Sequence, residues 1–199
     1  MPKLKLTKGE LKRQKDDLRR FERFLPMLQL KKQQLQVQRR QMDEHLKRTW
    51  DERERRVEAM RPWIAVLGAD VDVGALLGHG ELALRQENIA GVHLPVFERL
   101  DLAPVPYDLF EMPLWVDRAV VEVRALLDLD ARGHILSRRR ELIERELAET
   151  SQRVNLFERV KVPTARENIR RLKVLLGDQE TAAVVRGKIA KRKRQVALP

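Results

Sequence analysis

Apolar residues recur every seven positions near both ends of this chain. The N-terminal arm carries two such series three residues apart, Leu4, Leu11, Leu18 and Leu25 in one and Phe21, Leu28, Leu35 and Met42 in the other. The C-terminal arm carries similar series, namely Leu136, Ile143, Thr150 and Phe157, then Leu147 and Val154, and after Pro163 the residues Ala165, Ile169, Leu172 and Leu176. A repeat of 3.5 residues makes a helical stripe too narrow to be buried alone, so each arm needs a partner helix.

Glycine and proline divide the chain into three segments. Five of the nine glycines and five of the nine prolines fall between residues 62 and 113, and the flanking arms are nearly free of both. This pattern predicts an N-terminal helix over 1–61, a middle insert over 62–113 and a C-terminal helix with its tail over 114–199. Because one chain returns on itself, the predicted fold is predominantly all-α: a long antiparallel coiled coil with a small insert.

Local signals mark where these helices begin and bend. Thr7 and Glu10 are spaced as a capping box, in which each side chain accepts a hydrogen bond from the other residue's backbone amide. We expect the last helix to run from about 114 to about 190, with Gly133 either weakening it or splitting it in two. Pro26 and Pro163 should each bend a helix, either as simple curvature or because the shaft must not be straight.

The register of the two arms follows if their ends are level. Contacting positions then have numbers that add to about 196, which places Leu11 beside Val185 and Phe21 beside Leu175 or Leu176. The sequence also allows a register in which the two arms are shifted by one helical turn. The predicted seam of the coiled coil consists of Leu11, Leu18, Phe21, Leu28, Leu35, Ile143, Leu147, Val154, Phe157, Ile169, Leu172 and Leu176.

The middle segment has the pattern of extended structure. Residues 81–87 alternate loosely between apolar and polar side chains, and residues 89–102 are rich in Val, Leu and Ile. A short β-hairpin followed by a proline-bounded loop accounts for both stretches. Two strands alone are only marginally stable in water, so the hairpin needs the side of the coil or another protein to pack against.

Composition agrees with long helices better than with a broad globular core. Charged residues make up 36% of the chain and aromatic residues only 5%. Cysteine is absent, which rules out disulfides and zinc–thiolate sites and fits a reducing cytoplasm. We expect no signal peptide, because residues 1–15 alternate charges with single leucines. The longest apolar run, residues 63–69, is too short to cross a membrane, so we expect no direct membrane insertion.

Positive charge is concentrated in the two arms. Residues 1–61 carry 19 basic and 10 acidic side chains, a net charge of +9, and residues 114–199 carry 20 and 12, a net charge of +8. The middle segment carries 2 basic and 8 acidic side chains, a net charge of −6. The arms therefore favour a negatively lined cavity or nucleic acid, and the middle favours a different partner.

No set of residues predicts catalysis, a cofactor or a metal site. The segment from Gly177 to Gly187 and Lys188 has the wrong spacing for a nucleotide-binding loop. Asp70 and Asp72 could hold a metal ion, but two loop aspartates are commonplace. No metal-ligand spacing connects the four histidines, His45, His79, His93 and His134.

The basic run Lys188–Arg194 allows two interpretations. Cations suit a helix C-terminus, where they oppose the negative end of the helix dipole, and such an end can face a partner protein. A terminal run of Lys and Arg can also bind phosphates. Because no aromatic side chains that could stack on bases lie nearby, we favour the helix end over nucleic acid.

Four stretches of the sequence carry a family resemblance. They are Thr7-Lys8-Gly9-Glu10-Leu11, Leu-Lys-Lys-Gln-Gln-Leu at 30–35, Ala-Gly-Val-His-Leu-Pro at 90–95, and Arg153-Val154-Asn155 with Glu158 and Val162-Pro163. In this order and layout they resemble the D subunit of V-type (archaeal and bacterial-type) ATPases and ATP synthases, the central rotor stalk. The chain departs from that pattern at Ala90, where the family commonly has Met, at Leu156-Phe157, and over 64–80, which has no clear counterpart.

The resemblance implies a mechanical role without catalysis. Both ends of the coiled coil would insert into a catalytic head of alternating A and B subunits, which bind and hydrolyse ATP. The middle would bind the F subunit of the stalk and seat on the funnel-like subunit (C/d) above the membrane ring. One copy per complex would transmit torque between ion flow and nucleotide chemistry, in the cytoplasm and peripheral to the membrane.

Two surfaces are hypothesised to carry these contacts. The partner-facing part of the hairpin is placed at Ile89, Gly91, Val92 and Pro95. The bearing surface against the head is placed at Lys8, Lys12, Arg13, Arg19, Arg20, Lys188, Lys191 and Arg192. The alternatives to a rotor are a basic coiled coil that binds nucleic acid and a scaffold that assembles through helices of different chains.

Overall fold

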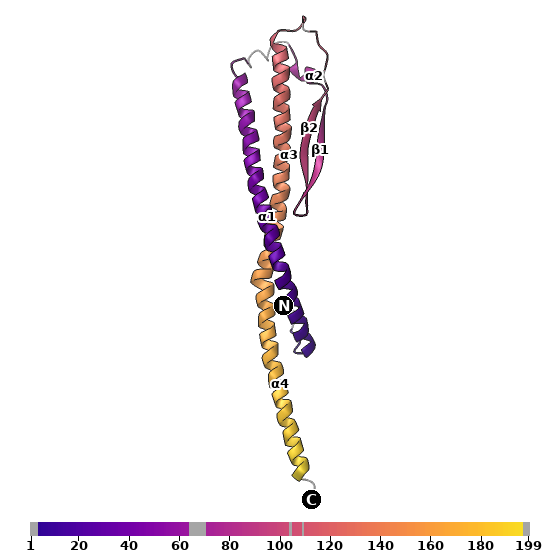
Figure 1. Ribbon diagram of the computed structural model, residues 1–199, viewed down its shortest axis with the longest axis vertical. Helices are drawn as coiled ribbons and strands as arrows, with labels where there is room; N and C mark the ends of the chain where they lie inside the picture. Colours follow the sequence, from indigo (N-terminus) through magenta and orange to yellow (C-terminus); the bar gives the residue numbers. More distant parts are fainter. Residues whose placement is uncertain (1–3, 64–70, 104, 109, 197–199) are drawn as a thin grey trace. The chain divides into compact units, whose positions relative to one another are not determined.

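The computed structural model describes residues 4–63, 71–103, 105–108 and 110–196. Helix α1 (Lys8–Met60) is followed by the short helix α2 (Val73–Leu77), the strands β1 (Gly80–Ile89) and β2 (Val92–Leu102), and helix α3 (Trp115–Leu156) (Figure 1). A π-helical turn, η2 (Phe157–Lys161), connects α3 to the last helix, α4 (Val162–Val196). The predicted fold, helical with an antiparallel hairpin in the middle, is confirmed; α2 was not predicted.

The N-terminal cap of α1 forms only half of the predicted box. The amide of Glu10 donates to the Thr7 hydroxyl at 3.2 Å. The amide of Thr7 donates instead to the Lys5 carbonyl at 3.1 Å, and the Glu10 carboxylate accepts from the Gln14 side chain at 2.8 Å. The hydroxyl therefore caps the helix as expected, while the carboxylate turns along the helix to a neighbour four residues away.

The chain forms two compact units. Unit 1 contains Met1–Lys31 and Thr150–Pro199, the two ends of the sequence, and unit 2 contains Lys32–Glu149. Both long stretches of helix contribute residues to each unit.

Unit 1 is a pair of helical segments from opposite ends of the chain. Phe21 of α1 meets Phe157 edge to face, with ring centroids 5.3 Å apart. Further along, Arg166 reaches Glu22 at 2.9 Å. The C-terminal segment buries a stripe of small and branched side chains: Val154, Val162, Ala165, Ile169, Leu172 and Leu176.

The π-helical turn corrects the phase of that stripe. Buried or half-buried positions follow one another at steps of three and four residues up to Phe157, and again from Val162 onward. Between Phe157 and Val162 the step is five, which would rotate the stripe off the seam in an α-helix. A π turn holds one extra residue, so it absorbs the step. The Val162 amide donates to the Phe157 carbonyl, and Pro163, which has no amide hydrogen, comes next in the chain.

The described residues of unit 2 form two apolar clusters. One joins α1, α3 and the hairpin through Leu35, Met42, Leu94 and Ile143, which are at most 6% exposed. The other lies where α2 and the loop after the hairpin meet α3, with Leu76, Val116 and Val120 buried. Arginine–carboxylate pairs link α1 to α3 beside these clusters, namely Arg56–Glu122 at 3.3 Å, Arg53–Asp130 at 2.5 Å and Arg140–Asp43 at 2.6 Å.

Helix α3 runs through Gly133 without a break. A β-carbon at this position would lie 2.7 Å from the Trp50 ring of α1. The glycine is therefore the residue that lets an indole pack directly on the α3 backbone. Of the two alternatives left open by the sequence, a continuous helix is correct, and the proximity of Trp50 gives a packing reason for a mid-helix glycine.

The hairpin has a two-residue loop. Ala90 and Gly91 both have positive φ, 51° and 82°, as a type I′ turn requires. Ile89 pairs with Val92 and the register continues to Gly80 and Leu102, with one shift between Ala83 and Leu84. The hairpin lies along α3, where its inner residues join the first apolar cluster (Figure 1).

The predicted register of the two arms is wrong. Lys8 pairs with Glu180, eight residues before the expected partner position, and Phe21 contacts Phe157 instead of Leu175 or Leu176. Val185, expected beside Leu11, is 48% exposed. The assumption of level ends was the error, because α4 continues beyond the start of α1 (Figure 1).

Candidate interaction surfaces

The basic residues predicted on α1 lie on the exposed surface of unit 1. Most of their charges are met by carboxylates of the same helix. Arg13 lies 3.8 Å from Glu10 and 3.9 Å from Asp17, and Arg20 also pairs with Asp17. Arg19 and Lys8 pair with Asp16 and Glu180, whereas Lys12 has no carboxylate partner among the described residues. This part of the predicted bearing is therefore a mixed-charge surface.

The basic residues predicted on α4 are in a different situation. Lys188, Lys191 and Arg192 are exposed and, within the part of the chain that the structure describes, contact no carboxylate. Every described side chain from Gly177 to Arg194 is exposed, including Val184, Val185 and Ile189 at 58, 48 and 51%. The end of α4 is a basic helix with unpartnered apolar side chains.

The structure does not bring the two predicted basic groups together. Lys8, at the start of α1, lies level with Glu180. Lys188 lies eight residues further along α4, which is roughly 12 Å at 1.5 Å per helical residue. The bearing hypothesis thus concerns two successive surfaces, a mixed-charge one on α1 and a strongly basic one on α4.

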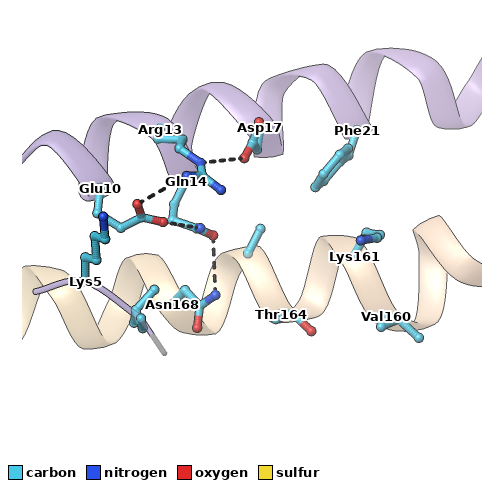
Figure 2. A pocket seen from close by; sticks show the side chains of 12 residues that line it. Lys5, Glu10, Arg13, Gln14, Asp17, Phe21, Val160, Lys161, Thr164 and Asn168 are labelled. Carbon is cyan, nitrogen blue, oxygen red and sulfur yellow. Dashed lines mark hydrogen bonds and ion pairs between the residues drawn. The ribbon is translucent and has the colours of Figure 1, made fainter. Parts of the chain in front are cut away.

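A cleft of about 490 Å³, lined by both polar and apolar side chains, opens between α1 and the C-terminal helix of unit 1 (Figure 2). Phe21 closes one end of it. At its centre the Asn168 amide group donates to the Gln14 side-chain oxygen at 3.3 Å, and Gln14 donates in turn to Glu10. These polar side chains use their hydrogen bonds on one another. A polar pair across an otherwise apolar seam fixes the register of two helices, because any shift would leave both members unpaired.

Two exposed ion pairs keep their charges over a wide range of pH. The hydrogen bond between Lys8 and Glu180 raises the pKa of Lys8 and lowers the pKa of Glu180. Their link is thus lost only when pH falls through the lowered pKa of Glu180 or rises through the raised pKa of Lys8. Arg171, aided by Arg170, lowers the pKa of Glu167 in the same way. Both contacts stay fully charged across the neutral range.

The hairpin residues predicted to face a partner are divided between two environments. Ile89 and Val92 pack against the apolar cluster of unit 2, so the chain itself covers much of these side chains. Gly91 is exposed in the turn and Pro95 is half-buried in β2. Exposed apolar side chains occur instead on β1, where Leu82 and Leu84 are 43 and 44% exposed. Sequence alternation around residues 81–87 was the signal that could have identified them.

The twelve predicted seam residues are all at least half-buried. Leu35, Ile143, Val154, Ile169, Leu172 and Leu176 are buried, and Leu11, Leu18, Phe21, Leu28, Leu147 and Phe157 are half-buried. The heptad pattern did not predict the polar seam pair Gln14–Asn168. A matched pair of amide side chains at opposite positions of two stripes would have been its signal.

The candidate ligand sites take structural roles where they are described. Asp72 caps α2 by accepting from the amides of Gly74 and Ala75, and Asp70 lies outside the described residues. The segment between Gly177 and Gly187 is helical. Among the described residues no three His, Asp or Glu side chains gather as a metal site would require. None of the described helices is long and apolar enough to cross a membrane.

Comparison with known proteins decides the family. The family model described as the ATP synthase D subunit matches residues 10–192. The chain belongs to the ATP synthase D-subunit family. It is 41% identical over 191 residues to the V-type ATP synthase D subunit of Borreliella burgdorferi, covering 96% of this chain and 95% of that protein. The corresponding subunit of Chlamydia caviae is 29% identical over 195 residues, covering 96% of this chain and 94% of the relative. The resemblance seen in the sequence is confirmed.

For a member of the D-subunit family, the structural features that bear on function are the surfaces at which its helices pair and the surfaces that they leave exposed. The V-type family match fits a coiled-coil part of a rotary motor. The conspicuous features of unit 1, a fixed helix register, a phase-correcting turn and an exposed basic helix end, all bear on how helices pair and what they touch.

Proposed function

We propose that this chain is the non-catalytic central shaft of a V-type ATP synthase, transmitting torque between the ion-translocating membrane ring and the ATP-binding head. The observation that carries the proposal is the pairing of the two ends of the chain in one unit, in a chain that matches the D-subunit family from residue 10 to residue 192. Opposite ends packed side by side resist twisting better than one helix does, because the seam side chains must slide past each other for the pair to turn.

The partners of such a shaft are the A and B subunits of the head, the F subunit of the stalk and the funnel-like subunit (C/d). One copy per complex suffices, held at the cytoplasmic side and peripheral to the membrane through these partners. The proposal assigns catalysis to the head alone. The chain contributes surfaces whose contacts differ from one catalytic site to the next.

The asymmetry of unit 1 supplies the physical basis for coupling. At the level of Lys8 two helices are present, and beyond Glu180 α4 is the one helix of the described residues that continues. A surface without rotational symmetry inside a ring of similar subunits touches each of them differently. Each catalytic site then favours the state that its own contact stabilises, so the angle of the shaft sets the state of the site.

The basic end of α4 is proposed as the principal bearing. Its cations have no carboxylate partners within the described residues, whereas those of α1 are largely paired. Unpaired cations steer a protein toward acidic walls, and the apolar side chains between them can pack once inside.

Charge reversal tests this bearing directly. Lys188, Lys191 and Arg192 changed together to Glu should weaken assembly with A and B subunits by at least about tenfold at low salt, as expected for several lost charge contacts. The matched control reverses Lys12, Arg13 and Arg19, whose surface already contains carboxylates, and should have a smaller effect. The measurement is a binding titration of the full-length chain against purified head. Equal effects of the two triple variants would contradict the assignment to α4.

A further inference from the structure

The hairpin of unit 2 has backbone edges without a neighbouring strand. Among the described residues the sheet contains β1 and β2 alone. Seven of the ten residues of β1 are exposed, while β2 contributes the fully buried Leu94. An edge strand presents a row of amide and carbonyl groups that another chain can pair with.

The turn determines which residues of β1 point to its free edge. In a hairpin with a two-residue loop, the flanking pair exchanges both of its backbone hydrogen bonds, and such pairs then alternate with non-bonded ones. Ile89–Val92 is the flanking pair, followed by the non-bonded pair Asn88–His93. By this alternation the amides and carbonyls of Leu84, Gln86 and Asn88 face away from β2.

The two edges of the hairpin differ in protection. On β2, Pro95 stands opposite Gln86 in a non-bonded pair, so the outer edge lacks an amide there. The register shift leaves Glu98 of β2 without an opposite residue, a second irregularity on the same strand. Strand β1 contains no proline and no lysine, and the extra residue is not on it. Proline and an extra unpaired residue, two of the features by which proteins discourage edge pairing, thus occur on β2 and not on β1, although β1 carries charged side chains at Glu81, Arg85 and Glu87.

We propose that the outer edge of β1 receives an extended segment of another protein of the complex as a third strand. This inference rests on the proposed function for the source of the segment and goes beyond it in assigning the mode of contact. The exposed side chains of Leu82 and Leu84 would pack against a segment that has apolar side chains at alternate positions.

The charge around the hairpin indicates what kind of segment would add to β1. The exposed Arg85 of β1 pairs with Glu98 of β2 at 3.9 Å, whereas Glu81 of β1 is exposed, and residues 62–113 carry a net charge of −6, so the incoming segment is expected to carry basic residues. A second copy of this chain would bring the same acidic segment to meet itself, which like-charge repulsion opposes.

A proline at an outward-facing amide tests the proposal. Gln86→Pro removes one such amide and leaves every bond between β1 and β2 in place, as the natural Pro95 does on the facing strand. The matched control is His93→Pro, which removes an outward-facing amide from β2. We expect Gln86→Pro to weaken assembly of the full-length chain with purified A, B, F and C/d subunits about tenfold, the effect of one lost hydrogen bond plus strand distortion, and His93→Pro to have no effect.

Amide hydrogen exchange gives a second readout. In the assembled complex, the amides of Leu84, Gln86 and Asn88 should exchange at least about tenfold more slowly than in the chain alone. Normal assembly of Gln86→Pro, or unchanged exchange of these three amides in the complex, would overturn strand addition while leaving the shaft proposal intact. Failure of the wild-type chain to assemble with the four subunits would overturn both. Dimers of the isolated chain that Gln86→Pro abolishes would assign the edge to a second copy and overturn the proposed occupant.

Discussion

At the residue scale, single side chains explain features that the sequence left ambiguous. Gly133 looked like a weak point of a long helix, and it is the site where the Trp50 ring packs on the α3 backbone. Gly177, also inside a helix, has nothing within 4 Å of a would-be β-carbon. The first glycine makes room for a ring, and the second faces open space. Substitution by alanine should therefore change stability in opposite directions at the two positions.

Gly133→Ala should lower the stability of unit 2 by about 1–3 kcal/mol, because the new methyl group would overlap the indole. Gly177→Ala should raise the stability of unit 1 by about 0.5–1 kcal/mol, because glycine is a poor helix former and the site is open. Chemical denaturation followed by circular dichroism measures both. A Gly133→Ala protein that gains as much stability as Gly177→Ala would show that Trp50 does not lie against α3.

At the element scale, the main feature of the C-terminal helical stretch is the π turn η2 that interrupts it between α3 and α4. The seam positions of the chain are nearly all readable as heptads, yet one extra residue between Phe157 and Val162 puts the two halves of the stripe out of phase. The π turn at that point, with Pro163 just after it, keeps Val154 and Ile169 on one face. Sequence periodicity alone locates such a skip but not the turn that absorbs it, since an α-helix could also twist or unwind there.

Removing the skip should convert the turn to α-helix. The variant that lacks Glu158 and carries Pro163→Ala restores steps of three and four residues throughout, so its thermal midpoint should equal or exceed that of wild type. Deletion of the exposed Arg170, inside regular α-helix, should instead put Leu172 and Leu176 off the seam and lower the midpoint by several degrees or more. Differential scanning calorimetry compares the three proteins. Equal losses in both deletions would mean that the π turn does not correct a phase.

At the scale of the whole molecule, the architecture could be predicted from the sequence, but the register of the two helical arms could not. Heptads, glycine and proline placement and the strand pattern were enough for two paired arms and a hairpin between them. They could not fix the stagger, because a seven-residue repeat fits its partner equally well when shifted by seven. The contacts that fix it are few and specific: Gln14 with Asn168, and Phe21 with Phe157. Level ends were assumed in the absence of such contacts, and this assumption gave the incorrect expectation that Leu11 would meet Val185.

The candidate surfaces, too, could be predicted from the sequence only in part. The basic character of both arms was predictable by counting charges. The difference between them was not, because it depends on which cations find a carboxylate in the folded state, as Arg13 does and Lys188 does not among the described residues. The free edge of β1 likewise depends on strand pairing, which places Pro95 on one edge and leaves the other open.

Rotation of this chain inside an immobilised head tests the central claim most directly. The chain has no cysteine, so Val121→Cys, at a side chain 65% exposed on α3 of unit 2, offers one attachment point for an optical probe away from the proposed bearing on α4. With the head fixed to a surface and ATP supplied, the account predicts that the probe turns in one direction, in steps, and stops when ATP is exhausted. Steady ATP hydrolysis with a stationary probe would contradict it.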